Sequence, residues 1–251
     1  MLVTHGFGEH SGRYDEVVAA LTEQRLLVAT YDLRGHGRSG GERGHVLAFE
    51  DYVRDATALL DELRADAEFG RIERPALFGH SLGGLISTHL ALSAPDRFSG
   101  LALTSPFFGL ALEVPAVKLA LGRGMSRWFP RFSQPTGLSG AHVTHDAEIA
   151  RAYDNDPLGV KRCSARWFTE TTRAQEEALA RAGELRLPVF VMAAGDDRVA
   201  ALAATRRVFE RVASPDKELR VLDGLYHEVL NEVDRAPLIA ALATRLRAWF
   251  P

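Results

Sequence analysis

A serine in a tight, glycine-flanked motif is the first residue of this sequence that could act as a nucleophile. Ser81 stands in Gly-His-Ser-Leu-Gly-Gly, a G-x-S-x-G pattern that follows the apolar run at 75–78 and precedes a helical stripe. A strand-to-helix turn of this kind exposes the serine hydroxyl, and the flanking glycines let the backbone pass closely. Ser81 could also be an ordinary helix N-cap, but its context favours a nucleophile.

A serine nucleophile needs a base, and the base needs an acid that orients it. His227 follows the last apolar run, and the pair Asp196-Asp197 follows the run at 187–193. Both positions lie at the carboxyl ends of expected strands, where parallel sheets place their ligands. We therefore predict His227 as the base. We choose Asp197 as the acid, with Asp196 as a turn residue that bonds to local amides.

The glycine-rich segment His-Gly-Phe-Gly-Glu-His-Ser-Gly-Arg-Tyr at 5–14 suits a second role in acyl transfer. A hydrolase directs two backbone N–H groups at the oxyanion of its intermediate. We predict that Leu82, directly after the nucleophile, supplies one and that Phe7 supplies the other. A phosphate-gripping loop is the alternative, but neither a Walker lysine nor G-x-G-x-x-G accompanies the segment.

The elements that must position these residues alternate along the chain. Apolar, β-rich runs are found at 26–33, 76–80, 100–104, 187–193 and 217–222. Segments with helical spacing are found at 14–25, 49–65, 82–93, 200–212 and 237–250. Continuous apolar strands that alternate with helices predict an α/β fold with a parallel sheet covered on both faces.

This alternation stops between about residues 105 and 183. The stretch contains five prolines and short apolar helical pieces such as 114–121, and we find no clear strand in it. We predict one domain over 1–251, with a core at 1–105 and 184–251 and a helical or irregular insertion at 106–183. The apolar residues of this segment could line a ligand groove, meet a membrane or pack onto the core. They are Phe107, Phe108, Leu110, Leu112, Val114, Val117, Leu119, Leu121, Trp128, Phe129 and Phe132.

Composition excludes several other classes of function. The 251 residues carry 30 Lys and Arg against 33 Asp and Glu, so the net charge of −3 gives no electrostatic case for a nucleic-acid partner. The single cysteine, Cys163, excludes an internal disulfide and a multi-cysteine zinc site. No basic-then-apolar leader precedes the first motif and no apolar run approaches a membrane span. We expect a cytoplasmic location and no cofactor.

Several motifs together resemble one family. The segments at 5–14, Asp-Leu-Arg-Gly-His-Gly-Arg-Ser at 32–39 with its extension at 41–45, the Ser81 motif, the Asp197 segment and Tyr-His-Glu-Val-Leu-Asn-Glu at 226–232 closely resemble monoacylglycerol lipases. They also resemble related lysophospholipases of the α/β-hydrolase superfamily. The resemblance implies a serine hydrolase with a helical cap at 106–183 that acts on single-chain acyl esters, most suitably monoacylglycerol.

The same resemblance implies a site for the polar head of the substrate. The segment Tyr-Asp-Asn-Asp-Pro-Leu at 153–158 is similar to the family's Tyr-x-x-Asp-Pro-Leu element. It implies that Tyr153 and Arg13 hold the head group and that His80 borders the pocket. A surface salt bridge for Arg13 and cap packing for Tyr153 are the alternatives. A lysophospholipase, a short-chain carboxylesterase, an aminopeptidase-like acyl hydrolase and an inactive acyl-binding protein stay open, as does transient contact of the cap with a membrane surface.

Three further features concern a possible metal site, the single cysteine and the start of the sheet. His142, His145 and Asp146 stand close together, but no second cluster or HExxH helix supports a metal, so we predict none. Cys163 is expected to be a packed residue rather than a nucleophile. Family members carry strands before the His-Gly-x-Gly strand. We therefore expect either a truncated sequence or a sheet without its first strands, and we make no prediction of oligomeric state.

Overall fold

Six parallel strands form the centre of the protein, in the order β2-β1-β3-β4-β7-β8. The computed structural model of the chain describes residues 1–112 and 116–250, with the backbone alone for residues 116–120. The strands are β1 (Leu2–Thr4), β2 (Ala29–Tyr31), β3 (Leu77–His80), β4 (Leu101–Thr104), β7 (Val189–Ala194) and β8 (Lys217–Leu222). β1 lies inside the sheet, with Leu2 opposite Ala29 on one side and Leu77 on the other. The expectation of missing earlier strands stays a prediction.

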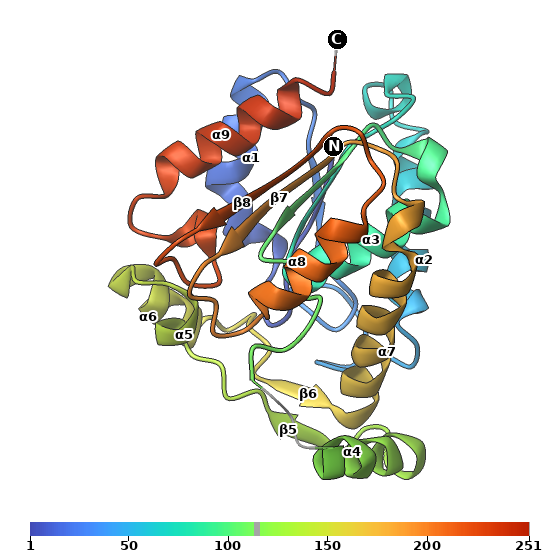
Figure 1. Cartoon of the computed structure of the whole chain (residues 1–251), viewed down its shortest axis with the longest axis vertical. Helices are drawn as coiled ribbons and strands as arrows, with labels where there is room; N and C mark the ends of the chain where they lie inside the picture. Colours follow the sequence, from blue (N-terminus) through green and yellow to red (C-terminus); the bar gives the residue numbers. More distant parts are fainter. Residues whose placement is uncertain (113–115, 251) are drawn as a thin grey trace.

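Helices cover both faces of this sheet (Figure 1), as the continuous apolar runs of the strands predict. Successive residues of each strand point to opposite faces, so Leu2 and Leu77 pack into one core, and Val3 and Phe78 into the other. α1 (Asp15–Glu23) and α9 (Arg235–Arg247) cover one face. The other face is covered by α2 (Glu50–Leu63), α3 (Leu82–Ser93) and α8 (Leu202–Arg211), and by α7 (Ala165–Arg181), which packs on α3. The predicted α/β fold with a parallel sheet is confirmed.

The segment between β4 and β7 departs from the alternation and lies at the carboxyl ends of the strands, around α4 to α6 in Figure 1. It contains α4 (Ala116–Trp128), α5 (Gly140–Val143) and α6 (Ala147–Asn155) before α7. The prediction of no strand here is wrong, because β5 (Ser133–Pro135) pairs antiparallel with β6 (Arg162–Ser164). Both strands are only three residues long and carry mostly polar side chains, so no apolar run marks them in the sequence. The division into core and cap at residues 106 and 183 stays a prediction.

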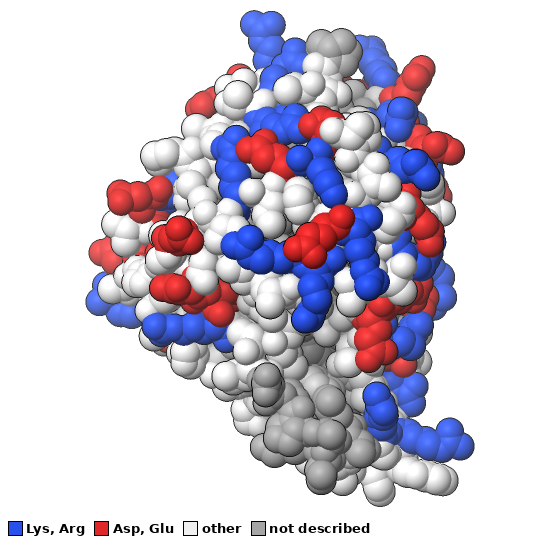
Figure 2. Space-filling model, in the orientation of Figure 1, with Lys and Arg blue, Asp and Glu red and all other residues white. Residues whose placement is uncertain are grey.

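Charges of both signs are interspersed over the face of the molecule in Figure 2. Many charged side chains form ion pairs with residues of other helices, such as Arg173 of α7 with Glu50 of α2 and Arg235 of α9 with Glu16 of α1. Among the described residues, none of the helices combines the length and apolar character that crossing a bilayer requires.

Candidate active site

Ser81 occupies a strained turn between the end of β3 and the start of α3. Its φ of +51° and ψ of −118° are values that non-glycine residues seldom adopt, at a cost of order 1–3 kcal/mol. Neighbouring backbone groups hold it there. Its N–H donates to the carbonyl of Thr104 at 3.0 Å, and its carbonyl accepts from the N–H groups of Gly84, Leu85 and Phe107. The turn is thus fixed by β4, by α3 and by the loop after β4.

Glycine is required on both sides of Ser81 because two backbones approach closely. A Cβ on Gly79 would lie 2.3 Å from the carbonyl oxygen of Gly83, across the turn. A Cβ on Gly83 would lie 2.1 Å from the carbonyl oxygen of Thr4 in β1. The first turn of α3 therefore rests directly on β1, and the close approach fits the sequence motif.

The structure brings the three residues chosen from the sequence into one hydrogen-bonded row. The Ser81 Oγ lies 2.8 Å from His227 Nε2, and His227 Nδ1 lies 3.0 and 2.9 Å from the two carboxylate oxygens of Asp197. A carboxylate only accepts, so Nδ1–H donates to Asp197 and Nε2 of the neutral ring accepts from the serine hydroxyl. All three side chains are buried. The arrangement can transfer a proton from serine to imidazole.

The neighbouring aspartates differ in their surroundings. One oxygen of Asp197 accepts from the N–H groups of Val199 and Ala200, each at 2.8 Å, while Asp196 is exposed. The expectation that Asp196 bonds to local amides is therefore wrong: Asp197 takes these bonds because its side chain turns inward at the end of β7. The N–H of Asp196 instead donates to the carbonyl of Leu225 and ties the loop of the acid to the loop of the base.

Burial and pairing act in opposite directions on the two titrating members of this row. Burial alone lowers the pKa of His227, but the charge and hydrogen bond of Asp197, together with the charges of Glu228 and Glu9, raise it overall above its ordinary value. Burial also tends to raise the pKa of Asp197, but the contact with His227 and the amide bonds lower it overall. Each partner thus favours the charged form of the other.

The two residues whose amides are predicted to bind an oxyanion come from separate segments, and Phe7 lines the same cavity as Ser81. Leu82 is the first residue of α3, where an N–H has no acceptor within the helix and the helix end carries partial positive charge. Phe7 lies in the loop after β1, and the N–H of its neighbour Gly6 donates to the buried Glu9. The Phe7 ring packs 4.3 Å from Trp167 of α7, measured between ring centroids. The loop is therefore held from two sides.

The three residues implied for the head group gather beside His227, but in different ways. The His80 ring lies 4.9 Å from that of His227, and burial lowers the pKa of His80 to about 4, so it is neutral at neutral pH. The Arg13 guanidinium lies 5.0 Å from the ring centre of Tyr153 in α6. His80 and Tyr153 line the main cavity, whereas Arg13 lies behind them in a buried ion pair with Glu228. The reading of Arg13 as a surface salt bridge is thus wrong.

Sequence reasoning missed two buried carboxylates at this point. Glu9 and Glu228 are each 3% exposed, and both line the cavity. Glu9 accepts from Gly6 and, at 2.7 Å, from the hydroxyl of Tyr14. Their positions in the sequence could have revealed them, because Glu9 lies in the segment at 5–14 and Glu228 in the segment at 226–232. A fully buried charged residue is almost always paired, as Glu9 and Glu228 are here.

The main cavity has a volume of about 570 Å³ and opens at the carboxyl ends of the strands. Ser81 and His227 lie at its polar end, while the rest is mainly apolar. Of the apolar residues noted in the sequence, those that line it are Phe107, Leu110, Leu112, Leu121 and Phe132. Phe108 is buried in the core instead, and Trp128 and Phe129 are exposed. The side chains of Val114, Val117 and Leu119 lie outside the described residues.

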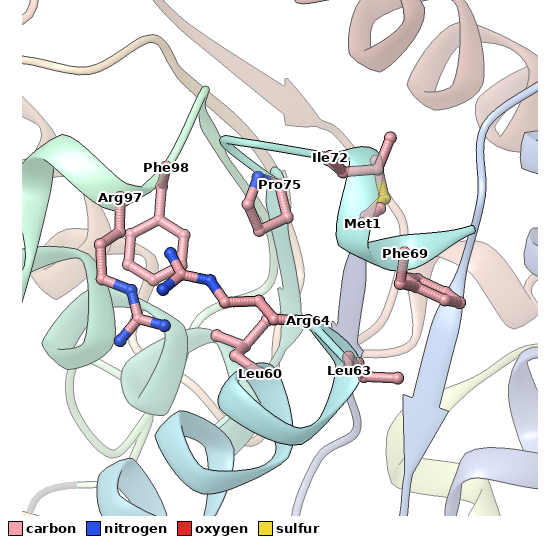
Figure 3. Close-up of a pocket in the computed structure, with 9 residues that line it drawn as sticks. All are labelled: Met1, Leu60, Leu63, Arg64, Phe69, Ile72, Pro75, Arg97 and Phe98. Carbon is pink, nitrogen blue, oxygen red and sulfur yellow. The ribbon is translucent and has the colours of Figure 1, made fainter. Parts of the chain in front are cut away.

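A second, much smaller cavity of about 20 Å³ lies at the opposite ends of the strands (Figure 3). Met1, Pro75 and Phe98, which precede or begin β1, β3 and β4, border it together with the end of α2. Its size holds no more than about one water molecule. This cavity is therefore too small for a lipid substrate.

The residues considered for a metal have other partners. His142 accepts from the N–H of Ser139 at 3.2 Å, and His145 contacts Glu232 at 3.0 Å. Asp146 caps α6 through the N–H groups of its first turn. Within residues 1–112 and 116–250, no three His, Cys, Asp or Glu side chains are grouped as a metal site. Cys163 is half-buried at the cavity wall, and burial raises the pKa of its thiol.

Comparison with known proteins supports the same chemistry. The model of the Hydrolase_4 family, described as serine aminopeptidase, S33, matches residues 1–234. The phospholipase YtpA of Bacillus subtilis is 31% identical over 244 residues, which are 96% of this chain and 92% of that protein. The monoacylglycerol lipase of Mycolicibacterium smegmatis is 31% identical over 94% of this chain and 83% of its own. The monoacylglycerol lipase structure from Paleococcus ferrophilus superposes with a TM-score of 0.91 at 29% identity, over 99% of this chain and 94% of that one.

Proposed function

Because the chain belongs to the Hydrolase_4 family (serine aminopeptidase, S33), we propose that it cleaves the ester bond of single-chain lipids. The chain is a carboxylic ester hydrolase with the α/β-hydrolase fold, similar to monoacylglycerol lipases. The substrate we propose is a monoacylglycerol, which gives a fatty acid and glycerol. The observation that carries this proposal is the row from Ser81 through His227 to Asp197, at the polar end of a large apolar cavity.

In the proposed mechanism, His227 takes the proton of Ser81 as the serine oxygen attacks the ester carbonyl. The N–H groups of Phe7 and Leu82 donate to the resulting oxyanion, and Asp197 stabilises the imidazolium. The bond to the alcohol then breaks, and His227 returns the proton to glycerol as it leaves. Water attacks the acyl-enzyme through the same base and releases the acid. No cofactor takes part.

The two ends of the cavity support the choice of substrate. Its apolar part, lined by side chains such as Phe107 and Phe132, suits one acyl chain. His80, Tyr153 and, through its ion pair, Arg13 supply polar groups beside the base for the head group. The exposed Trp128 and Phe129 of the proposed cap, residues 106–183, suit transient contact with a membrane surface. A cytoplasmic location stays a prediction, and no nucleic-acid partner is proposed.

Activity is expected to fall as pH drops through the pKa of His227, because only the neutral ring can accept the serine proton. Asp197 raises that pKa, so the acidic limb of kcat/KM should lie above the ordinary imidazole value of about 6.5. The measurement is kcat/KM on one ester between pH 5 and 9. A profile that stays flat down to pH 5 contradicts His227 as the base.

A substrate panel tests the lipid preference. Each methylene that enters the apolar cavity adds about 0.8 kcal/mol of favourable transfer free energy. The value of kcat/KM on p-nitrophenyl esters should therefore rise about tenfold for each two carbons until the cavity is filled. The substitution Leu110→Glu should lower kcat/KM on long-chain esters far more than on the acetate ester, since Leu110 lines the cavity. Leu47→Glu, at an exposed leucine outside this cavity, is the control.

The head-group arm of the panel decides between related activities. The kcat/KM on monoacylglycerol should exceed that on lysophospholipid, which is tested because the Bacillus subtilis relative is named a phospholipase. Preference for acetate or butyrate esters would indicate a short-chain carboxylesterase, and turnover of aminoacyl amides an aminopeptidase-like enzyme. Absence of a fluorophosphonate adduct on Ser81 would favour an inactive acyl-binding protein.

A further inference from the structure

Glu228 brings a buried carboxylate next to the proposed base. It directly follows His227, is 3% exposed and lines the main cavity. Its position is fixed from several sides. Its N–H donates to the carbonyl of Val143 at 2.9 Å, and its Oε2 accepts from the side-chain amide of Asn231 at 2.9 Å. Glu228 is thus a deeply buried ionisable group that makes no bond within the row from Ser81 to Asp197, and we therefore ask what its charge does.

Arg13 stands between Glu228 and a second buried carboxylate. Its Nη2 donates to Glu228 at 2.6 Å, while its Nε lies 3.7 Å from Glu9. The Arg13 side chain is 12% exposed, so water screens these contacts little. Two carboxylates share one guanidinium, and with both ionised the group of three carries a net charge of −1.

Two cations also lie near this group. Arg198 lines the cavity and stacks on the Tyr226 ring at 3.9 Å, but it is exposed, so water screens its charge. Lys161 lies 4.4 Å from the ring centre of Tyr153, on the cap side.

The remaining groups around His227 are neutral or negative. His80 is neutral near pH 7, because burial lowers its pKa. Tyr14 and Tyr153 face the same group and stay neutral, because burial raises their pKa values. Asp197 lies on the Nδ1 side of the imidazole and adds a further negative charge.

The two carboxylates divide their protons unequally. Burial, together with the negative charge of Glu9, raises the pKa of Glu228 to about 7, although Arg13 opposes this. For Glu9, burial raises the pKa, but His80, Arg13 and the hydrogen bond from Tyr14 lower it overall. Glu228 is therefore the member that gains or loses its charge near neutral pH.

We propose that Glu228 is a positioning residue for the reaction: its carboxylate, held by Arg13 at the polar end of the cavity, supplies the negative charge that favours the imidazolium of His227 during attack on the ester. This inference rests on the proposed chemistry of Ser81, His227 and Asp197. Glu228 accepts no proton from the substrate and forms no bond to it. It acts through the charge it places beside the base.

The sign of the effect follows from this geometry. An ionised Glu228 stabilises the protonated ring and therefore raises its pKa, as does Glu9. Glu228→Gln removes this charge and also leaves Arg13 with a weaker partner, and both changes disfavour the imidazolium. The acidic limb of kcat/KM should move to lower pH by about 0.5–1 unit. The same loss of stabilisation corresponds to a three- to tenfold lower kcat on the alkaline plateau.

The test compares wild type, Glu228→Gln, Glu228→Asp and Glu62→Gln across pH 5–9, by kcat/KM on a monoacylglycerol and by the rate of fluorophosphonate labelling. Glu62 is exposed on α2, so its change removes the same charge from a distant surface. The Glu228→Gln enzyme should show the shifted limb and the lower plateau, while the Glu228→Asp and Glu62→Gln enzymes keep the wild-type limb. If Glu228→Gln does not fold, Glu228→Asn compared with Glu228→Asp applies the same test.

The outcomes separate this inference from the proposed function. If wild type is not labelled at Ser81, the proposed function fails. If wild type is labelled but the limb of the Glu228→Gln enzyme coincides with the wild-type limb, Glu228 has no such role. An equal loss of kcat at every pH with an unmoved limb also overturns the inference, because it indicates a purely structural effect.

Discussion

Replacement of Ser81 by alanine is expected to lower kcat on a monoacylglycerol by about four to six orders of magnitude. In the proposed mechanism, His227 deprotonates this hydroxyl, which lies 2.8 Å from its Nε2, and no acyl-enzyme forms without it. Binding of the acyl chain should change little, because the cavity is unaltered. The measurements are kcat, KM and fluorophosphonate labelling, and labelling should disappear.

A matched control for this prediction lies in the same helix. Ser87 is buried in α3, and its hydroxyl has no hydrogen-bond partner among the described residues. Ser87→Ala removes the same atom without touching the row from Ser81 to Asp197, so kcat should stay within about twofold. A Ser81→Ala enzyme with more than about 1% of wild-type activity would rule out Ser81 as the nucleophile.

Alanine at Gly83 is expected to destabilise the protein by at least about 2 kcal/mol, which lowers Tm by roughly 4–8 °C, and to reduce kcat more than tenfold. The new Cβ would lie 2.1 Å from the carbonyl oxygen of Thr4 and 2.5 Å from that of His5. Both are backbone atoms of β1 and of the loop after it, so no side chain can rotate away. The start of α3 must move, and it carries both Ser81 and the Leu82 amide.

The same substitution in an open helix should have the opposite sign. Gly124 lies in α4, and a Cβ there would meet nothing within 4 Å. Gly124→Ala is expected to leave Tm unchanged or raise it slightly, because alanine favours helix by up to about 1 kcal/mol over glycine. Thermal unfolding of both variants is the measurement. A Gly83→Ala protein with wild-type Tm and kcat would show that α3 does not rest on β1 as described.

Long, strongly patterned elements were predictable from the sequence. The run at 187–193 overlaps β7 (Val189–Ala194), and the stripe at 82–93 matches α3, because a continuous apolar strand and a turn-delimited helix leave a direct pattern. The strands β5 and β6 were not predictable. Their pairing joins Gln134 to Cys163 and depends on contacts between distant segments rather than on local residue types.

The sequence was sufficient to choose the residues of the candidate site, but it did not reveal which groups pair with them or how their charges are balanced. Ser81, Asp197 and His227 were chosen because each follows an apolar run at the end of a strand, and the structure brings them together. The sequence could not assign the bonds to the amides of Val199 and Ala200, which go to Asp197 rather than Asp196. That choice depends on which carboxylate turns inward at the end of β7.

The sequence by itself thus determined the α/β fold, the strained serine turn and the order of the predicted catalytic residues, because local spacing and residue type encode them. Only the tertiary structure decided that Arg13 is shared by Glu9 and Glu228 beside His227. Arg13 and Glu228 are 215 residues apart in the chain. Burial and Coulomb interaction depend on distances in space, so this charge beside the proposed base exists only once the segments that follow β1 and β8 are packed together.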